Sequence, residues 1–290
     1  IRGYFANNFQ DISYYNLRNE KVFKHDEHLG DRAFKKAITF SKYILKKNDD
    51  LANTFLFPYT TETCTNDLLY KSYKVSKNLN IPLRTHFAQY KSEVENSYKI
   101  HKRSPLGRLN KLNILDQNIT LTHSIYLNKN YKKEKISTKD LKCLHDTGTN
   151  ICHCPVVYLR KGYGLNSFQS LVNSGINVGI GTDTVPPDII NEMRTTSLLS
   201  KIKDDDPTSG NAQQVYNAAT LGGAKALNRN DLGRLDKGCR ADILIINISN
   251  IRTGLVDDPI KSLVYYSNSN DIKTVIINGK IILNNYKIIG

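Results

Sequence analysis

The sequence predicts an α/β fold made of parallel βαβ units, the pattern of a (β/α)8 barrel, and three observations support this. First, residues 81–86, 119–123 and 177–183 are strand-like runs that end on His86, His123 and Asp183. Second, helical patterns separate these runs, which makes neighbouring strands parallel. Third, the catalytic side chains of a barrel lie at the carboxyl ends of its strands, where these three residues fall. We therefore expect a barrel whose strand ends carry a functional site.

Strands and helices alternate from the first residues to about residue 203. We expect strands at residues 2–5, 54–58, 81–86, 119–123, 150–155 and 177–183. Helical patterns include residues 31–47 and 66–79, and the second of these has Thr65 as an N-cap and ends at Asn80. Asp188, which follows two prolines, opens another helix after the last strand. These are six barrel strands and not eight.

The C-terminal part follows a different pattern. A polar, acidic loop over residues 204–210 precedes a helix that contains Ala218 and Leu227. Short β-type runs then follow at residues 241–246, 263–266 and 274–283, and the dipeptide Asn278-Gly279 breaks the last run into a hairpin. This segment is therefore expected to form a small β-structure beside the barrel.

Composition excludes two classes of partner. The formal charge is +14, but the basic residues are spread along the chain, with pairs at Lys35–Lys36, Lys46–Lys47 and Lys132–Lys133 that we assign to polar helix faces or loops. We therefore expect no nucleic-acid binding. No apolar run is long enough to span a bilayer, so no membrane association is expected. The five cysteines have no C-x-x-C spacing, which favours reduced thiols and a cytoplasmic protein.

The motifs resemble, in order along the chain, those of the amidohydrolase superfamily, within it the triazine-hydrolase and nucleobase-deaminase (ATZ/TRZ) branch. The matching segments are Thr63-Cys64-Thr65, Thr85-His86-Phe87-Ala88-Gln89, Ser104-Pro105-Leu106, Leu121-Thr122-His123, Cys152-His153-Cys154-Pro155, Gly181-Thr182-Asp183-Thr184, Glu192-Met193-Arg194, Gly223-Ala224 and Gly233-Arg234-Leu235. The resemblance implies a barrel beside a composite β-sandwich. Residues 1–235 are then a partial barrel, and residues 236–290 are the C-terminal half of the sandwich.

The resemblance also implies a hydrolase with one divalent metal ion, Zn or Fe, that acts on a C–N or C–halogen bond of a nitrogen heterocycle. By this carry-over His86 is a metal ligand, and Asp183 is both a ligand and a catalytic proton shuttle. His123 faces the attacking water as a catalytic residue. Such an ion lowers the pKa of its water, and a nearby carboxylate accepts the proton. The expected partner is a small heterocyclic substrate, and the expected assembly is a homo-oligomer.

One family feature is absent from the sequence. The family's first barrel strand carries an H-x-H pair that supplies two ligands, whereas here His25 and His28 are spaced H-x-x-H in a loop or helix start. Residues 2–5 correspond to the family's third strand, so the first two strands are missing. The non-Met start favours an N-terminally incomplete chain, which alone should bind metal poorly. The alternative is a catalytically inactive scaffold that lost its metal site.

Two further residues are expected to contact substrate, Gln89 and His153. Many family members have a proton-donating Glu where Gln89 stands, and an amide can donate a hydrogen bond but no proton at neutral pH. Glu93 lies one helical turn on and could substitute, although we favour a salt bridge with nearby lysines. His153 lies between Cys152 and Cys154, whose side chains share one strand face opposite to it.

The remaining candidates carry weaker signals. His101 and His145 have no pattern and are expected at the surface. Arg160, Lys161 and Tyr163 follow the strand over residues 150–155 into a loop at the active-site end, within reach of a substrate.

Overall fold

The computed structural model describes residues 1–17, 20–127, 136–163, 168–250 and 256–289. The chain divides into two compact units, residues 2–151 and residues 152–290 together with residue 1, which we call the N-terminal and C-terminal units. Lys132 and Lys133 lie outside the described residues. Each unit is described by itself.

The N-terminal unit contains the predicted alternation of strands and helices. Its elements are β1 (Gly3–Phe5), β2 (Asn8–Phe9), β3 (Ile12–Leu17), β4 (Glu20–His25), α1 (Glu27–Lys47), β5 (Ala52–Thr54), β6 (Phe57–Pro58), α2 (Asn66–Leu79), β7 (Leu83–Phe87), α3 (Lys91–His101), α4 (Pro105–Lys111), β8 (Ile119–His123), α5 (Thr138–Thr147) and the start of β9 (Asn150–His153).

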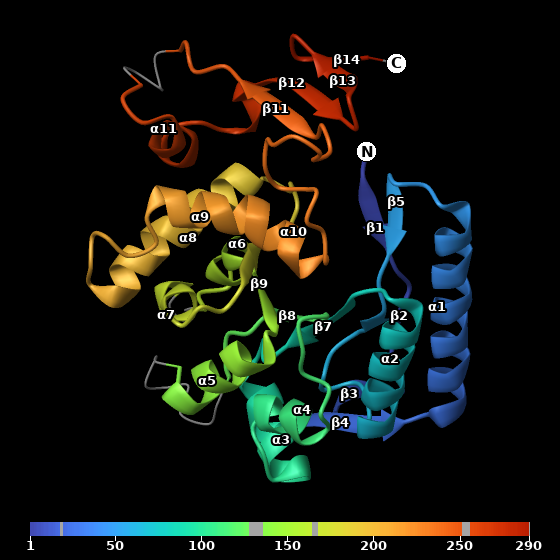
Figure 1. Ribbon diagram of the computed structural model, residues 1–290. Helices are drawn as coiled ribbons and strands as arrows, with labels where there is room; N and C mark the ends of the chain where they lie inside the picture. The colour runs from blue at the N-terminus through green and yellow to red at the C-terminus, as the bar shows by residue number, and fades with distance from the viewer. Residues whose placement is uncertain (18–19, 128–135, 164–167, 251–255, 290) are drawn as a thin grey trace. The chain divides into compact units, whose positions relative to one another are not determined.

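Apart from the antiparallel hairpin β3–β4, the strand pairs described in this unit are parallel. Strand β1 pairs with β5, β2 with β6, and β7 with β8, all in parallel register. Parallel bridges from Leu56 to Leu83 and from Thr60 to His86 join the β6 segment to β7. Beside β8, the Asn150 side chain donates to the Ile119 carbonyl over 3.1 Å. Figure 1 shows the long helix α1 running alongside β5, and α1 also contacts β2. This is the arrangement that βαβ units require.

Local signals set the helix boundaries. The Thr65 hydroxyl accepts a hydrogen bond from the Leu68 amide at the start of α2, and Asn80 ends the helix in the left-handed region with φ of 52°. Both predicted ends of α2 are therefore confirmed. Helix α1 begins at Glu27 and not at residue 31, because the Asp26 carboxylate accepts from the Leu29 amide and caps it there.

The hairpin β3–β4 was not predicted. Its strands pair in antiparallel register, with Tyr14 opposite Phe23 and their rings 6.0 Å apart. His25 is the last residue of β4, so its predicted position in a loop is wrong, whereas His28 lies in the first turn of α1 as expected.

The C-terminal unit combines mostly short helices with short strands. Its elements are the end of β9, α6 (Pro155–Leu159), α7 (Phe168–Asn173), β10 (Val178–Ile180), α8 (Ile189–Asp204), α9 (Ala212–Asn217), the π-helical turn η2 (Ala218–Gly222), α10 (Gly223–Ala226), β11 (Ile243–Ile246), α11 (Pro259–Tyr265), the 3-10 turn η3 (Ser269–Asp271), β12 (Ile272–Ile277), β13 (Lys280–Asn284) and β14 (Lys287–Ile288).

The last strands form an antiparallel sheet in the order β11-β12-β13-β14. Asn278 and Gly279 join β12 to β13 with φ of 49° and 77°, so the predicted hairpin turn is confirmed. The predicted β-type run over residues 263–266 is wrong, because residues 263–265 belong to α11 and Tyr266 is its C-cap. The Asp258 carboxylate accepts from the amides of Ile260 and Lys261 and starts a helix that overrides the strand-like composition.

Most predicted strands are confirmed, although the observed strands are generally shorter than the predicted ranges. The strand expected at residues 54–58 consists of two short strands, β5 and β6, and Pro155 starts α6 in place of extending β9. In the C-terminal unit the Gly181 amide donates to the His153 carbonyl over 2.9 Å, which joins the ends of β10 and β9. The Asp188 carboxylate caps α8 as predicted.

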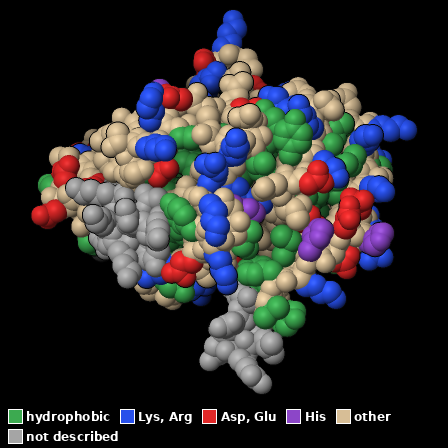
Figure 2. Space-filling view, turned by 90° about the horizontal axis from the view of Figure 1, so that it is seen from below, with side chains coloured by type: hydrophobic (Ala, Val, Ile, Leu, Met, Phe, Trp, Pro, Cys, Tyr) green, Lys and Arg blue, Asp and Glu red, His purple; other side chains and the backbone are tan. Residues whose placement is uncertain are grey.

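Two of the predicted lysine pairs lie on the surface of helix α1. Lys35, Lys36, Lys46 and Lys47 are exposed on α1. Figure 2 shows Lys and Arg side chains spread over the face, with Asp and Glu side chains among them. Among the described residues, no helix has both the length and the apolar character needed to cross a bilayer.

Candidate functional site

His86 is held at the carboxyl end of β7 by the segment that follows β6. The Tyr59 carbonyl lies 3.1 Å from the His86 amide nitrogen and 2.9 Å from the ring nitrogen Nδ1. A carbonyl oxygen only accepts, so Nδ1 must carry the proton, and the lone pair of the neutral ring lies on Nε2. Metal-binding histidines are commonly oriented in this way by a backbone carbonyl that accepts from the other ring nitrogen. His86 is therefore prepared to ligate through Nε2.

His123 ends β8 directly beside His86. Its ring is nearly parallel to that of His86, with an interplanar angle of 6° and centroids 5.3 Å apart, and the residue is 3% exposed. The backbone of His123 has φ of 78°, and that of Ser124 has φ of 53°. Non-glycine residues in this region cost about 1–3 kcal/mol each and concentrate at functional sites. The bond from the Ser124 amide to the Phe87 carbonyl, 3.0 Å long, holds this turn in place.

Asp183 follows β10 in the C-terminal unit. It lies three residues beyond Ile180, is exposed, and has φ of 45°. The Arg160 guanidinium donates to the Thr184 hydroxyl over 2.9 Å and to the Val185 carbonyl over 3.4 Å. These bonds tether the loop immediately after Asp183, so Arg160 has a structural contact here that sequence analysis did not foresee.

His153 is buried in the C-terminal unit and packs against Phe168, with ring centroids 6.1 Å apart. Burial lowers the pKa of His153 to about 4, so the ring is neutral at physiological pH. The Sγ atoms of Cys152 and Cys154 lie 3.9 Å apart, which confirms that the two cysteines share one strand face. A Cβ at Gly181 would lie 2.9 Å from the Cys152 Sγ, so glycine is needed for this packing.

Gln89 is half-buried, and its backbone leads into α3. The expected salt bridge between Glu93 and lysines is wrong, because Glu93 is only 3% exposed. Its carboxylate accepts from the Thr61 hydroxyl at 2.5 Å, from the Ala88 amide at 2.9 Å and from the Gln89 amide at 3.0 Å. Burial raises the pKa of Glu93 to about 7, and these hydrogen bonds oppose the rise.

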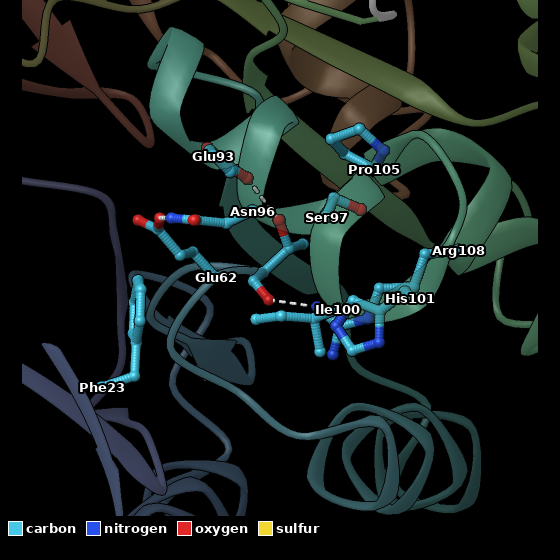
Figure 3. A pocket seen from close by; sticks show the side chains of 10 residues that line it. Phe23, Glu62, Glu93, Asn96, Ser97, Ile100, His101, Pro105 and Arg108 are labelled. Carbon is cyan, nitrogen blue, oxygen red and sulfur yellow. Dashed lines mark hydrogen bonds between the residues drawn. The ribbon is translucent and has the colours of Figure 1, made fainter. Parts of the chain in front are cut away.

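A small cavity lies next to Glu93 between α3, α4 and the segment after β6. Figure 3 shows Glu93, Arg108 and His101 around it. Arg108 is 6% exposed and donates to the Thr61 carbonyl and, over 2.7 Å, to the Cys64 carbonyl. His101 was expected at the surface, but it is half-buried, and burial lowers its pKa to about 4.

The structure therefore brings together His86 and His123 in the N-terminal unit, whereas Asp183 and His153 belong to the C-terminal unit. His145, with its side chain 58% exposed, lies at the surface as predicted. Sequence analysis missed the Tyr59 carbonyl, Thr61 and Arg108, since a backbone acceptor and a buried network leave no motif. The donor chemistry of the predicted site, imidazole nitrogens and a carboxylate, suits Zn²⁺ or Fe²⁺.

Comparison with known proteins decides the family. A sequence model of the amidohydrolase family matches residues 19–282. The chain belongs to the amidohydrolase family. It is 29% identical over 262 residues to the 5-methylthioadenosine/S-adenosylhomocysteine deaminase of Pyrococcus horikoshii. That match covers 89% of this chain and 60% of the relative, so the chain spans well under two thirds of its length.

Two zinc-bound crystal structures have the same fold. An adenosine deaminase from Xanthomonas campestris matches with a TM-score of 0.85 and 22% identity, over 99% of this chain and 62% of that one. The atrazine chlorohydrolase TrzN from Arthrobacter aurescens matches with a TM-score of 0.78 and 21% identity, over 88% of this chain and 57% of that one. Both likenesses establish the mixed α/β fold of this family.

Proposed function

We propose that the protein containing this amidohydrolase chain is a metal-dependent aminohydrolase that removes an amino group from an adenine-type heterocycle. The observation that carries this proposal is the pair of strand-end histidines, with His86 fixed so that Nε2 is the accepting nitrogen and His123 stacked on it. The name of the Pyrococcus relative supports a 5′-substituted adenosine as the substrate class. The likeness to a chlorohydrolase leaves a C–halogen bond as the second candidate.

Each predicted residue has a role in this proposal. His86 and Asp183 would hold one divalent ion, Zn or Fe, which when bound supplies Lewis acidity to the site. The Asp183 carboxylate takes the proton released as water attacks the ring carbon. His123 stabilises the charge that builds on the substrate in the transition state. The backbone at His123 and Asp183, with φ of 78° and 45°, supports their functional roles.

Gln89 and His153 are proposed substrate contacts. The neutral His153 ring is able to accept or donate a single hydrogen bond, as recognition of a heterocycle requires. Gln89 can hydrogen-bond a ring nitrogen but cannot protonate it, which favours substrates whose leaving group departs readily.

Other features of the whole protein belong to the same proposal. We propose that residues 1–235 contribute six strands to a (β/α)8 barrel and that residues 236–290 contribute half of a composite β-sandwich. The parallel pairs β1–β5, β2–β6 and β7–β8 and the antiparallel sheet β11 to β14 support this division. The five free thiols support a cytoplasmic location, and a homo-oligomer stays a prediction.

Turnover of Asp183→Asn tests the proposal. With 5′-methylthioadenosine as substrate, release of ammonia by the full-length gene product should fall at least about a hundredfold, because the variant lacks the proton acceptor. Asp205→Asn is the matched control, since Asp205 is an exposed helix C-cap with φ of 51°, where asparagine fits well. Retained turnover in Asp183→Asn would show that this carboxylate is not in the reaction. If the unmodified protein also releases no ammonia and binds no divalent metal ion, the inactive scaffold is favoured.

A further inference from the structure

The buried carboxylate of Glu93 joins two segments that flank His86. One oxygen accepts from the Thr61 hydroxyl and the Ala88 amide, and the other accepts from the Gln89 amide. Ala88 and Gln89 follow His86 in the chain, whereas Thr61 belongs to the turn after β6. Figure 3 shows the Glu93 side chain pointing from α3 toward this turn. Three donors converge on two oxygens, so both oxygens are needed as acceptors.

The turn that Glu93 holds also holds the His86 ring. The Thr61 amide donates to the His86 carbonyl over 3.2 Å, and the Tyr59 carbonyl accepts from the His86 Nδ1 over 2.9 Å. On the other side of the turn, Arg108 donates to the Thr61 carbonyl, so Thr61 is fixed by its amide, carbonyl and hydroxyl groups. Rotation of this turn would move the Tyr59 carbonyl away from the ring.

We infer that Glu93 is a positioning residue for His86. It fixes the turn over residues 59–61 so that the Tyr59 carbonyl keeps the proton on Nδ1 and leaves Nε2 as the accepting nitrogen. Only the expected effect on metal affinity rests on the proposed function, because the tautomer of the ring is a property of the metal-free chain. The inference also explains why a carboxylate occupies this position. A glutamine has one accepting oxygen and would turn an NH₂ group toward one of the three donors.

The experiment compares Glu93→Gln with Glu95→Gln, an exposed glutamate two residues on in the same helix. In ¹⁵N-histidine-labelled, metal-free protein, the His86 ring is identified by its loss in His86→Asn, and its tautomer is read from the ring ¹⁵N shifts. The unmodified chain and Glu95→Gln should show a proton on Nδ1. Glu93→Gln should show a mixed or Nε2-protonated ring, together with at least a tenfold weaker apparent affinity for Zn²⁺.

A second pair of variants keeps the inference testable if Glu93→Gln fails to fold. Thr61→Val removes the hydroxyl that donates to Glu93, and Thr61→Ser retains it. Thr61→Val should shift the tautomer in the same direction, and Thr61→Ser should leave the Nδ1 proton in place. A folded Glu93→Gln or Thr61→Val with the tautomer of the unmodified chain would overturn the inference. Absence of zinc binding by the full-length gene product in every variant would count against the proposed function alone, since the tautomer shift in the metal-free chain still decides the role of Glu93.

Discussion

Gly222→Ala should strongly destabilise the C-terminal unit, whereas Gly223→Ala, one residue on, should not. A Cβ at Gly222 would lie 2.1 Å from the Val178 carbonyl oxygen and 3.0 Å from its carbon. A Cβ at Gly223 would meet nothing within 4 Å. The two glycines therefore differ sharply in the space available, although they are adjacent in one helical segment.

The expected cost follows from these distances. Ordinary contact begins at 3.4 Å, so the η2 turn or strand β10 must move by more than 1 Å to admit the methyl group. Overpacking of this kind costs about 1–3 kcal/mol. The bond from the Asn177 side chain to the Gly222 carbonyl, 3.1 Å long, would be lost as well, at about 1 kcal/mol. We expect a total loss of about 3 kcal/mol for Gly222→Ala, against a gain of about 0.5–1 kcal/mol for Gly223→Ala from helix propensity.

Urea unfolding followed by circular dichroism and tyrosine fluorescence measures both free energies, since the chain has 17 tyrosines and no tryptophan. A Gly222→Ala variant within 1 kcal/mol of the unmodified chain would refute the close packing of η2 on β10. An equal loss in Gly223→Ala would refute the asymmetry between the two positions.

Three further predictions concern single side chains. Burial lowers the pKa of His153 from 6.5 to about 4, so its contribution to stability is full above pH 6.5 and is lost as the pH falls toward 4. The free energy of unfolding should fall by on the order of 3 kcal/mol over this range. In His153→Gln the free energy of unfolding should depend less steeply on pH between 6.5 and 4. An unchanged pH dependence would contradict the buried, neutral ring. In the full-length enzyme, Gln89→Glu should shift the pH–rate profile and favour ammonia over chloride as leaving group; if neither changes, residue 89 lies outside the reaction path. Burial raises the pKa of the Cys64 thiol to about 12, so this thiol should react with Ellman's reagent only after unfolding; rapid reaction in the native chain would show that it is accessible.

The elements of the fold that could be predicted are those whose boundaries are set by residues close to them in the sequence. Strand β8 and helix α2 have the predicted boundaries, because an alternation of apolar residues with threonine and a Thr65 cap define them locally. The β-type prediction for residues 263–266 failed because the composition of the run was weighed above the Asp258-Pro259 helix start. The hairpin β3–β4 was missed, since its strands lie between a short strand and a long helix without a distinct turn motif.

In the candidate site too, features that local sequence encodes were predicted, and features that depend on distant segments were missed. The strand-end positions of His86 and His123 follow from sequence alone, because parallel strands deliver their last residues to one edge. The Tyr59 carbonyl was missed, since a backbone acceptor has no residue signature. The prediction of a salt bridge between Glu93 and nearby lysines failed, because the burial of Glu93 depends on Thr61, 32 residues earlier in the chain, which no local pattern reveals.

The metal content of the full-length gene product tests the central claim most directly. Elemental analysis of the purified protein should find close to one equivalent of zinc or iron, and His86→Asn should lose it while an exposed control, His145→Asn, retains it. A full-length protein that purifies and refolds without a bound divalent ion, even after incubation with Zn²⁺ or Fe²⁺, would contradict the proposed metal site.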